Sequence, residues 1–208
     1  MIQLVREPDR GKPSLPLEPE NLSEQFPLTV PEEFDATEVS DHLYRGRLML
    51  FIDGANLFYA ASQMGIEIDY AKLLRYFQQQ STLIYAFFYT GVDPSNTRQQ
   101  AFLSWMRHNG YRVVTKDVIL NSTGSKRVNR MNVEIAVDMM RFAQHCDTEI
   151  LISGDGDLAY AVSTVSHCGA KVEVIALRSM TPDNLTRVAD NFIDLFSIRQ
   201  EIQKAPRH

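Results

Sequence analysis

The chain has 208 residues, enough for one domain with an extension or for two small domains, and 44% of them are hydrophobic, which is ample for a folded core. No apolar run approaches the roughly 18 residues of a membrane span, and the charged, proline-containing N-terminus lacks the apolar stretch of a secretory signal. The two cysteines form no CxxC pair. These features predict a cytoplasmic protein with no membrane partner, since cytosolic proteins keep few paired cysteines.

Acidic residues and prolines are concentrated at the N-terminus. Residues 1–46 carry 4 basic and 10 acidic residues, whereas residues 47–208 carry 17 and 16, and six of the nine prolines lie in the first 31 residues. Residues 1–46 are therefore expected to form an acidic, extended N-terminal extension. It is either a solvated tail or an arm that binds a protein partner or covers the functional site. The balanced remainder is compatible with a nucleic-acid ligand.

From Arg47 onward, short apolar runs alternate with segments of helical spacing. Strands are predicted at 48–52, 82–91, 111–116, 148–153 and 170–177, with a further short strand at 117–120. Helices are predicted at 55–64, 70–79 after an Asp69 N-cap, 95–110, 131–146, 156–169 and, as general helical character, 181–203. The stretch 121–130 is expected to be a loop. This alternation predicts an α/β domain over residues 47–200, with a mostly parallel sheet between helices, and a C-terminal tail at 201–208.

Two groups of apolar residues have a predicted orientation. The helix at 131–146 is expected to bury one face formed by Met131, Val133, Val137 and Met140. The aromatic residues that follow the acidic motifs are expected to pack in the core rather than to stack on nucleic-acid bases; they are Phe58, Tyr59 and Tyr160.

Aspartates stand at the ends of two predicted strands. Asp53 follows the strand at 48–52, in FIDGAN, and Asp155 and Asp157 follow Ser153, in ISGDGD. The carboxyl ends of parallel strands meet at one edge of a sheet, where like charges repel unless a hard cation such as Mg²⁺ or Mn²⁺ offsets them. Each aspartate alone is also compatible with a helix N-cap, but a cap needs only one acid. The pattern therefore predicts metal binding by Asp53, Asp155 and Asp157.

Further polar residues are suited to phosphodiester chemistry. Asn56 lies about one helical turn beyond Asp53 and can orient it or hold a phosphate oxygen, and Ser153 can support the same edge. Mg²⁺ or Mn²⁺ can activate a water and stabilise the leaving oxygen. Three basic residues of the loop at 121–130 are expected either to contact RNA phosphates or to be ordinary solvated side chains; they are Lys126, Arg127 and Arg130.

Several motifs in a fixed order add a family resemblance. FIDGANLF, VEIAVDMM, LISGDGDLAYAV, GAKVEVIAL and LTRVADNFIDL resemble the NYN domain, in the LabA-like branch of the PIN-like nuclease superfamily, over roughly residues 47–196. The resemblance implies a Rossmann-like three-layer α/β/α fold and divalent-metal-dependent cleavage of RNA. It also implies a catalytic acidic site of Asp53, Asp138, Asp155 and Asp157, supported by Asn56 and Ser153.

The chain departs from the family pattern just before and within the helix at 131–146. Asn132 stands where the family has an earlier aspartate, and Asn129 stands where it has a glycine. Asn132 can still support a cation through its carbonyl oxygen, but it brings no charge. Asp138 lies six residues later, about 240° around the helix, so it does not replace that aspartate.

Three functions remain as hypotheses. The first is a metal-dependent endoribonuclease, and the second is a catalytically weak or inactive RNA-binding or regulatory module of the same fold, as Asn132 indicates. The third, a phosphatase of the haloacid-dehalogenase type, is disfavoured because Ala55 stands where its second aspartate would fall. The histidines show no HExxH spacing for zinc, and no GxGxxG motif for a dinucleotide occurs. The RNA substrate, the number of metal ions and a homo-oligomeric state are left open.

Overall fold

A computed structural model of the chain describes residues 45–79, 81–117, 119–120, 126–127 and 130–205, with only the backbone described at 119–120 and 126–127. The predicted N-terminal extension lies outside the described residues, apart from its last two positions. Asn129 and most of the predicted loop at 121–130 also lie outside them.

A six-stranded sheet forms the centre of the domain, and every pairing between its neighbouring strands is parallel. The strand order is β3-β2-β1-β6-β7-β8. The bounds are β1 (Arg47–Asp53), β2 (Thr82–Val92), β3 (Tyr111–Asp117), β6 (Thr148–Ile152), β7 (Lys171–Ala176) and β8 (Asn191–Asp194). The predicted parallel sheet is thus confirmed. Its central strand β1 is buried along nearly its whole length, which explains its uninterrupted apolar run.

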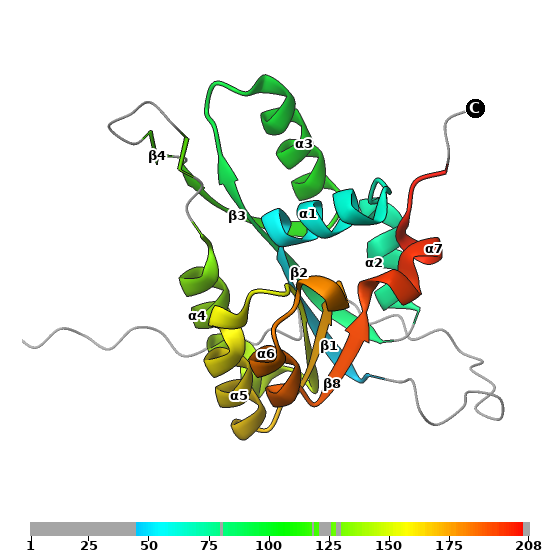
Figure 1. The fold of residues 1–208 in the computed structure, drawn as a ribbon, viewed down its shortest axis with the longest axis vertical. Coiled ribbons are helices and arrows are strands. Elements are labelled where there is room, and N and C mark those ends of the chain that lie inside the picture. The colour runs from blue at the N-terminus through cyan, green and yellow to red at the C-terminus, as the bar shows by residue number, and fades with distance from the viewer. Residues whose placement is uncertain (1–44, 80, 118, 121–125, 128–129, 206–208) are drawn as a thin grey trace, which may run out of the picture. The chain divides into compact units, whose positions relative to one another are not determined.

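Helices cover both faces of the sheet (Figure 1). One face carries α1 (Gly54–Met64), α2 (Tyr70–Gln78), α3 (Thr97–His108) and α7 (Arg199–Ile202), and the other carries α4 (Asn132–Phe142), α5 (Ala159–His167) and α6 (Asp183–Val188). Short 3-10 turns are η1 (Ala143–His145), η2 (Gly156–Leu158), η3 (Arg178–Met180) and η4 (Leu195–Ile198). Successive residues of β1 enter opposite cores, so the predicted three-layer α/β/α fold is confirmed.

The order of the strands creates a topological switch point. The chain passes from β1 outward to β2 and β3, and then returns to form β6 on the other side of β1. The loops that leave the carboxyl ends of β1 and β6 therefore run in opposite directions and open a crevice between them. Ligands of open α/β sheets bind in such crevices. Part of the segment that returns to this crevice, predicted as a short strand and a loop, forms an antiparallel pair, β4 (Ile119–Leu120) with β5 (Lys126–Arg127).

Close packing holds the start of α1 against the sheet. A Cβ atom added at Gly54 would lie 2.6 Å from Cζ of Phe88 and 2.9 Å from the carbonyl oxygen of Tyr89. Such contacts are too short for any side chain, so glycine is required by the approach of the helix to β2.

The C-terminal segment differs from its prediction. Residues 181–203, predicted as helical, contain α6, the edge strand β8, η4 and α7. The four residues of β8 pair with β7 alone, and such a short strand carries too little alternation to be separated from helical spacing. Ile202 is fully buried and Gln203 pairs with Ile68, so packed structure continues past the predicted domain boundary at residue 200.

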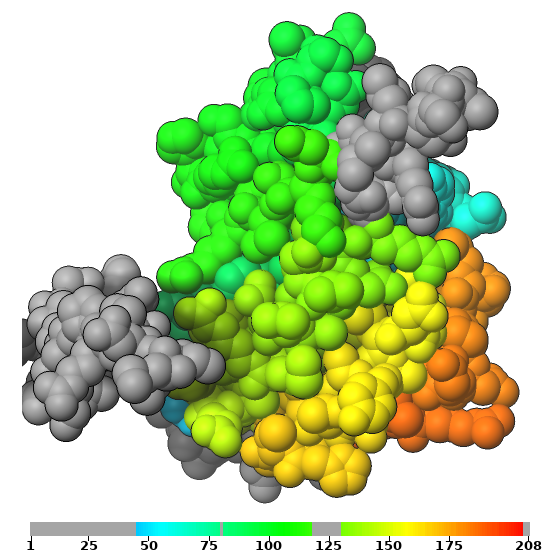
Figure 2. Space-filling model, turned by 90° about the vertical axis from the view of Figure 1, so that its left-hand side faces the viewer, coloured from blue at the N-terminus to red at the C-terminus, as the bar shows by residue number. Residues whose placement is uncertain are grey.

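The predicted buried face of the helix at 131–146 was also wrong. Val133, Val137 and Met140 are 68%, 53% and 42% exposed, whereas Ile135 and Met139 are fully buried and Met131 joins them. The helix carries two apolar stripes, and helical spacing alone does not select between them. Helix α4 packs beside α5 on the surface of this layer (Figure 2), and its packing onto the sheet buries the stripe that contains Ile135 and Met139.

Candidate functional site

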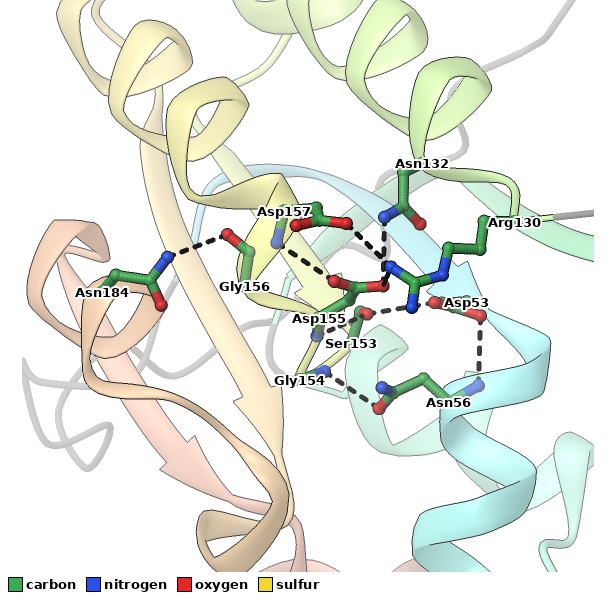
Figure 3. Close-up of polar contacts among 10 residues, drawn as sticks. All are labelled: Asp53, Asn56, Arg130, Asn132, Ser153, Gly154, Asp155, Gly156, Asp157 and Asn184. Carbon is green, nitrogen blue, oxygen red and sulfur yellow. Dashed lines mark hydrogen bonds and ion pairs between the residues drawn. The ribbon is translucent and has the colours of Figure 1, made fainter.

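A pocket of about 320 Å³ opens at the switch point. Its walls come from the carboxyl ends of β1 and β2, Asp155 in the turn after β6, the first turns of α1, and Arg130 and Met131 with the start of α4. Five of the polar residues singled out in the sequence line it, namely Asp53, Asn56, Arg130, Asn132 and Asp155 (Figure 3). Strand-end acids from β1 and β6 are thus brought to one cavity, as their positions in the sequence predicted.

Asp53 is the buried acid of the pocket, with only 8% of its surface exposed. Its Oδ1 accepts hydrogen bonds from the backbone N–H groups of Ala55 and Asn56, both at 3.1 Å, and its Oδ2 accepts one from the hydroxyl of Ser153 at 3.1 Å. Burial raises the pKa of Asp53 above its ordinary value, and the negative charge of Asp155 adds to the rise, while these hydrogen bonds oppose it. Asp53 therefore caps α1 and would also be stabilised in its charged form by a nearby cation.

Ser153 and Asn56 hold the two strand ends together. The fully buried Ser153 hydroxyl donates to Asp53 and accepts from the backbone N–H of Asp155 at 3.2 Å. The side-chain oxygen of Asn56 accepts a hydrogen bond from the backbone N–H of Gly154 at 2.9 Å. Ser153 therefore links Asp53 to the backbone of Asp155, and Asn56 links the first turn of α1 to the turn after β6.

Asp155 faces the start of α4. Its Oδ1 caps η2 by accepting from the N–H of Asp157 at 3.0 Å, and its Oδ2 accepts from the amide nitrogen of Asn132 at 3.0 Å. Asn132 is the first residue of α4. Its side chain thus contacts Asp155 from the position where the family pattern has an aspartate. The amide makes this contact without adding charge.

Asp157 lies at the rim rather than in the pocket. Its side chain is 67% exposed, and its Oδ2 lies 2.8 Å from a guanidinium nitrogen of Arg130. The same guanidinium nitrogen is 3.7 Å from Oδ2 of Asp155. In Figure 3 the Arg130 side chain points toward both carboxylates. An arginine thus already stands as a counter-ion to two of the three predicted metal ligands.

Asp138 is not brought together with the other three aspartates. It lies on α4 outside the pocket lining, and its Oδ2 accepts a hydrogen bond of 2.9 Å from the hydroxyl of Tyr89, on β2. Burial and the nearby charge of Asp138 raise the pKa of Tyr89, so the phenol keeps its proton and remains the donor. Because Tyr89 lines the pocket, Asp138 touches the site through that ring.

Comparison with known proteins identifies the family. The family model described as NYN domain matches residues 47–196. The chain is also 34% identical over 169 residues to the Low amplitude and bright protein LabA of Synechococcus elongatus, an alignment that covers 77% of this chain and 90% of LabA. The chain belongs to the NYN domain family. A crystal structure of a protein of unknown function from Vibrio parahaemolyticus shares the NYN fold, with a TM-score of 0.65 and 24% identity over 80% of this chain and all of that one.

Membership of the NYN family, within the PIN-like nuclease superfamily, and the likeness to LabA suggest an RNA-related nuclease or regulatory role. The LabA-like resemblance drawn from the motifs is therefore confirmed. In the described part of the chain, no helix has the length and apolar character needed to cross a membrane.

The donor atoms of the NYN pocket suit a hard divalent cation. Within the described residues, no three acidic, histidine or cysteine side chains form a ready-made metal cage. Mg²⁺, however, is commonly held by one or two carboxylates together with waters and substrate phosphates. Asp53 and Asp155 provide two carboxylates in one pocket, and the carbonyl oxygen of Asn132 adds a neutral oxygen. This oxygen-only set fits Mg²⁺ or Mn²⁺ better than it fits a softer metal.

The aromatic residues near the NYN site are exposed, contrary to prediction. Phe58, Tyr59 and Tyr160 are 65%, 59% and 83% exposed, because they lie on the outer sides of α1 and α5. Tyr59 lines the pocket, a role that the sequence interpretation missed. Its position three residues after Asn56, on the same side of a helix, was the available signal. Lys126 and Arg127 lie in β5, where the structure describes the backbone alone.

Proposed function

We propose that this NYN protein is a divalent-metal-dependent endoribonuclease that hydrolyses RNA phosphodiesters. The observation that carries the proposal is the convergence of Asp53 and Asp155 on one pocket at the switch point of the sheet. The two carboxylates are close enough for the charge of Asp155 to raise the pKa of Asp53. Keeping both of them charged without a cation nearby costs free energy. Such an arrangement supports a catalytic purpose rather than a structural one.

Each residue has a separate task in this proposal. Asp53 and Asp155 bind the cation, Asn132 offers its amide oxygen, and Asp157 extends the negative charge to the rim. When bound, Mg²⁺ or Mn²⁺ supplies activation of the attacking water and stabilisation of the leaving oxygen. Ser153 keeps Asp53 oriented and favours its charged form through the hydroxyl hydrogen bond.

Three kinds of group around the pocket match the parts of a nucleotide. The acids suit a metal that binds phosphate, the guanidinium of Arg130 suits a phosphate oxygen, and the exposed ring of Tyr59 presents a face to a base. A base is free to stack on a side chain only when it is unpaired. Single-stranded RNA is therefore the substrate that we propose, with Lys126 and Arg127 of β5 as further phosphate contacts.

The second hypothesis, a catalytically weak regulatory module, is favoured by one contact. Asn132 donates to Asp155 at 3.0 Å and brings no negative charge to the position where the family pattern has an aspartate. Changing Asn132→Asp separates the two hypotheses. If loss of the family aspartate has made the wild type nearly inactive, Asn132→Asp should raise Mn²⁺-dependent cleavage at least about tenfold. The reason is that an added carboxylate strengthens metal binding.

The experiment that tests the proposal measures cleavage of a labelled single-stranded RNA with Mn²⁺ or Mg²⁺ and with EDTA. Wild type should cleave only with metal, and Asp155→Asn should lose at least about 100-fold in rate, the scale on which metal-held groups act. Asp183→Asn is the matched control, because Asp183 is an exposed aspartate outside the pocket that pairs only with Arg187 in the described ion pairs. Cleavage that survives EDTA, or that is equal in Asp155→Asn and wild type, would contradict the proposal.

A further inference from the structure

Arg130 lies where a cation would be expected. One guanidinium nitrogen is 2.8 Å from Asp157 and 3.7 Å from Asp155, and the oxygen of Asp155 that it approaches is also the acceptor from Asn132. Among the described residues that line the pocket, Arg130 is the only lysine or arginine. The charges of Asp155 and Asp157 are thus already partly balanced within the protein.

The bond that holds Arg130 is weak enough to exchange. Its side chain is 72% exposed and that of Asp157 is 67% exposed, and ion pairs between exposed groups contribute little to stability. A guanidinium forms paired hydrogen bonds with a phosphate as well as with a carboxylate. Moving Arg130 from the aspartates to a phosphate of a bound strand therefore costs little.

We propose that Arg130 is an exchangeable counter-ion that lies against Asp157 and against Asp155, one of the two carboxylates of the proposed metal site, and moves to an RNA phosphate when the strand binds. The inference rests on the proposed function, since it concerns the metal and the RNA of that same pocket. While Arg130 remains on the aspartates, its charge repels a divalent cation and lowers the affinity for it. Release by RNA restores the affinity, so metal and RNA bind cooperatively, and the coupling is reciprocal.

Asn132 is consistent with this exchange. With an amide at this position, Asp155 keeps a neutral hydrogen-bond donor at 3.0 Å instead of a second carboxylate. A single arginine therefore offsets part of the remaining negative charge of Asp155 and Asp157 in the absence of RNA.

The first test measures Mn²⁺ binding by calorimetry, without RNA and in 0.15 M KCl, for wild type and Arg130→Met. Loss of the positive charge should lower the Kd for Mn²⁺ by about five- to tenfold. Arg130→Lys keeps the charge and should stay near wild type. Arg187→Met is the matched control, because Arg187 is 78% exposed, pairs with Asp183 and lies outside the pocket, so its removal should leave the Kd unchanged.

The second test repeats the titration with a saturating phosphorothioate 2′-O-methyl oligonucleotide, shown by gel to remain intact. A phosphate can bind Mn²⁺ directly in both proteins, so the informative quantity is the difference between them. The oligonucleotide should lower the Kd for Mn²⁺ at least about threefold more in wild type than in Arg130→Met, since only wild type has an arginine to release.

The possible results separate this inference from the proposed function. Equal Mn²⁺ affinity in wild type and Arg130→Met, with binding still lost in Asp155→Asn, overturns the role of Arg130 and leaves the metal site standing. An equal effect of the oligonucleotide on both proteins overturns the release step. If Mn²⁺ binds none of the variants at millimolar concentration, the proposed function and this inference fall together.

Discussion

A buried glutamate gives the protein a pH-dependent stability that can be measured independently of function. Glu149, on β6, is fully buried, its Oε1 lies 3.9 Å from the thiol of Cys146, and its Oε2 has no hydrogen-bond partner among the described residues. Burial raises the pKa of Glu149 from 4.5 to about 8. The folded protein therefore holds a proton here at neutral pH that the unfolded chain releases.

The size of the effect follows from the two pKa values. Between pH 4.5 and pH 8 the unfolded state binds fewer protons at this position than the folded state, so the free energy of unfolding falls as the pH rises. Each unit of difference corresponds to about 1.4 kcal/mol. From about pH 5.5 to about pH 8.5, wild type should lose about 3 kcal/mol through Glu149 alone. Glu149→Gln does not titrate and should not show this loss.

Urea unfolding at these two pH values measures the difference. Between the lower and the higher pH, the stability of Glu149→Gln relative to wild type should rise by about 3 kcal/mol. Glu173→Gln is the matched control, because Glu173 is buried on the adjacent strand β7 but is paired with Arg45 at 2.7 Å and Lys171 at 2.9 Å. It should destabilise the protein at both pH values. A margin between Glu149→Gln and wild type that does not change with pH would refute the reasoning.

Three further changes test the site. Tyr59→Ala should weaken binding of single-stranded RNA in fluorescence anisotropy by about 1–3 kcal/mol, while Tyr160→Ala, exposed but outside the pocket, should not; equal affinities would exclude stacking at Tyr59. Ser153→Ala removes a hydrogen bond that lowers the pKa of Asp53, so Mn²⁺ binding, followed by calorimetry across pH, should require a higher pH; an unshifted profile would contradict this link. Gly54→Ala places a Cβ 2.6 Å from Phe88 and should cost about 1–3 kcal/mol in thermal unfolding; an unchanged Tm would show that the contact relaxes freely.

The fold was predictable where local signals coincide with buried structure. The apolar run of β1 ends in Asp53 and Gly54, which mark the end of a strand and the start of a helix, and Asp69 caps α2 as its position indicated. Prediction failed where the deciding interaction is distant in the chain. The edge strand β8 forms because it pairs with β7, and its four residues alone contain no signal that predicts this pairing. The same limit applies to α4, because both of its apolar stripes satisfy helical spacing.

The candidate site divides in the same way. Asp53 and Asp155 could be predicted to converge because the carboxyl ends of parallel strands meet, a rule that needs only the order of elements. The partners of each carboxylate could not be predicted, because they depend on side chains that reach across the pocket. Arg130 reaches Asp157 over 27 residues of sequence, and Tyr89 reaches Asp138 over 49.

The contacts of Arg130 and Asn132 change how the departure from the family pattern is understood. From the sequence, Asn132 is a lost ligand, and the expected consequence is a weaker enzyme. In the structure, Asn132 remains bonded to Asp155, and Arg130 approaches the same carboxylate oxygen, so the departure is a redistribution of charge around one atom. With an amide at position 132 and Arg130 against Asp155, we expect the pocket to have a low affinity for a divalent cation only while that arginine stays in place. The affinity of this pocket for metal therefore depends on whether a phosphate is present to draw Arg130 away, and a measurement on the RNA-free protein alone would underestimate it.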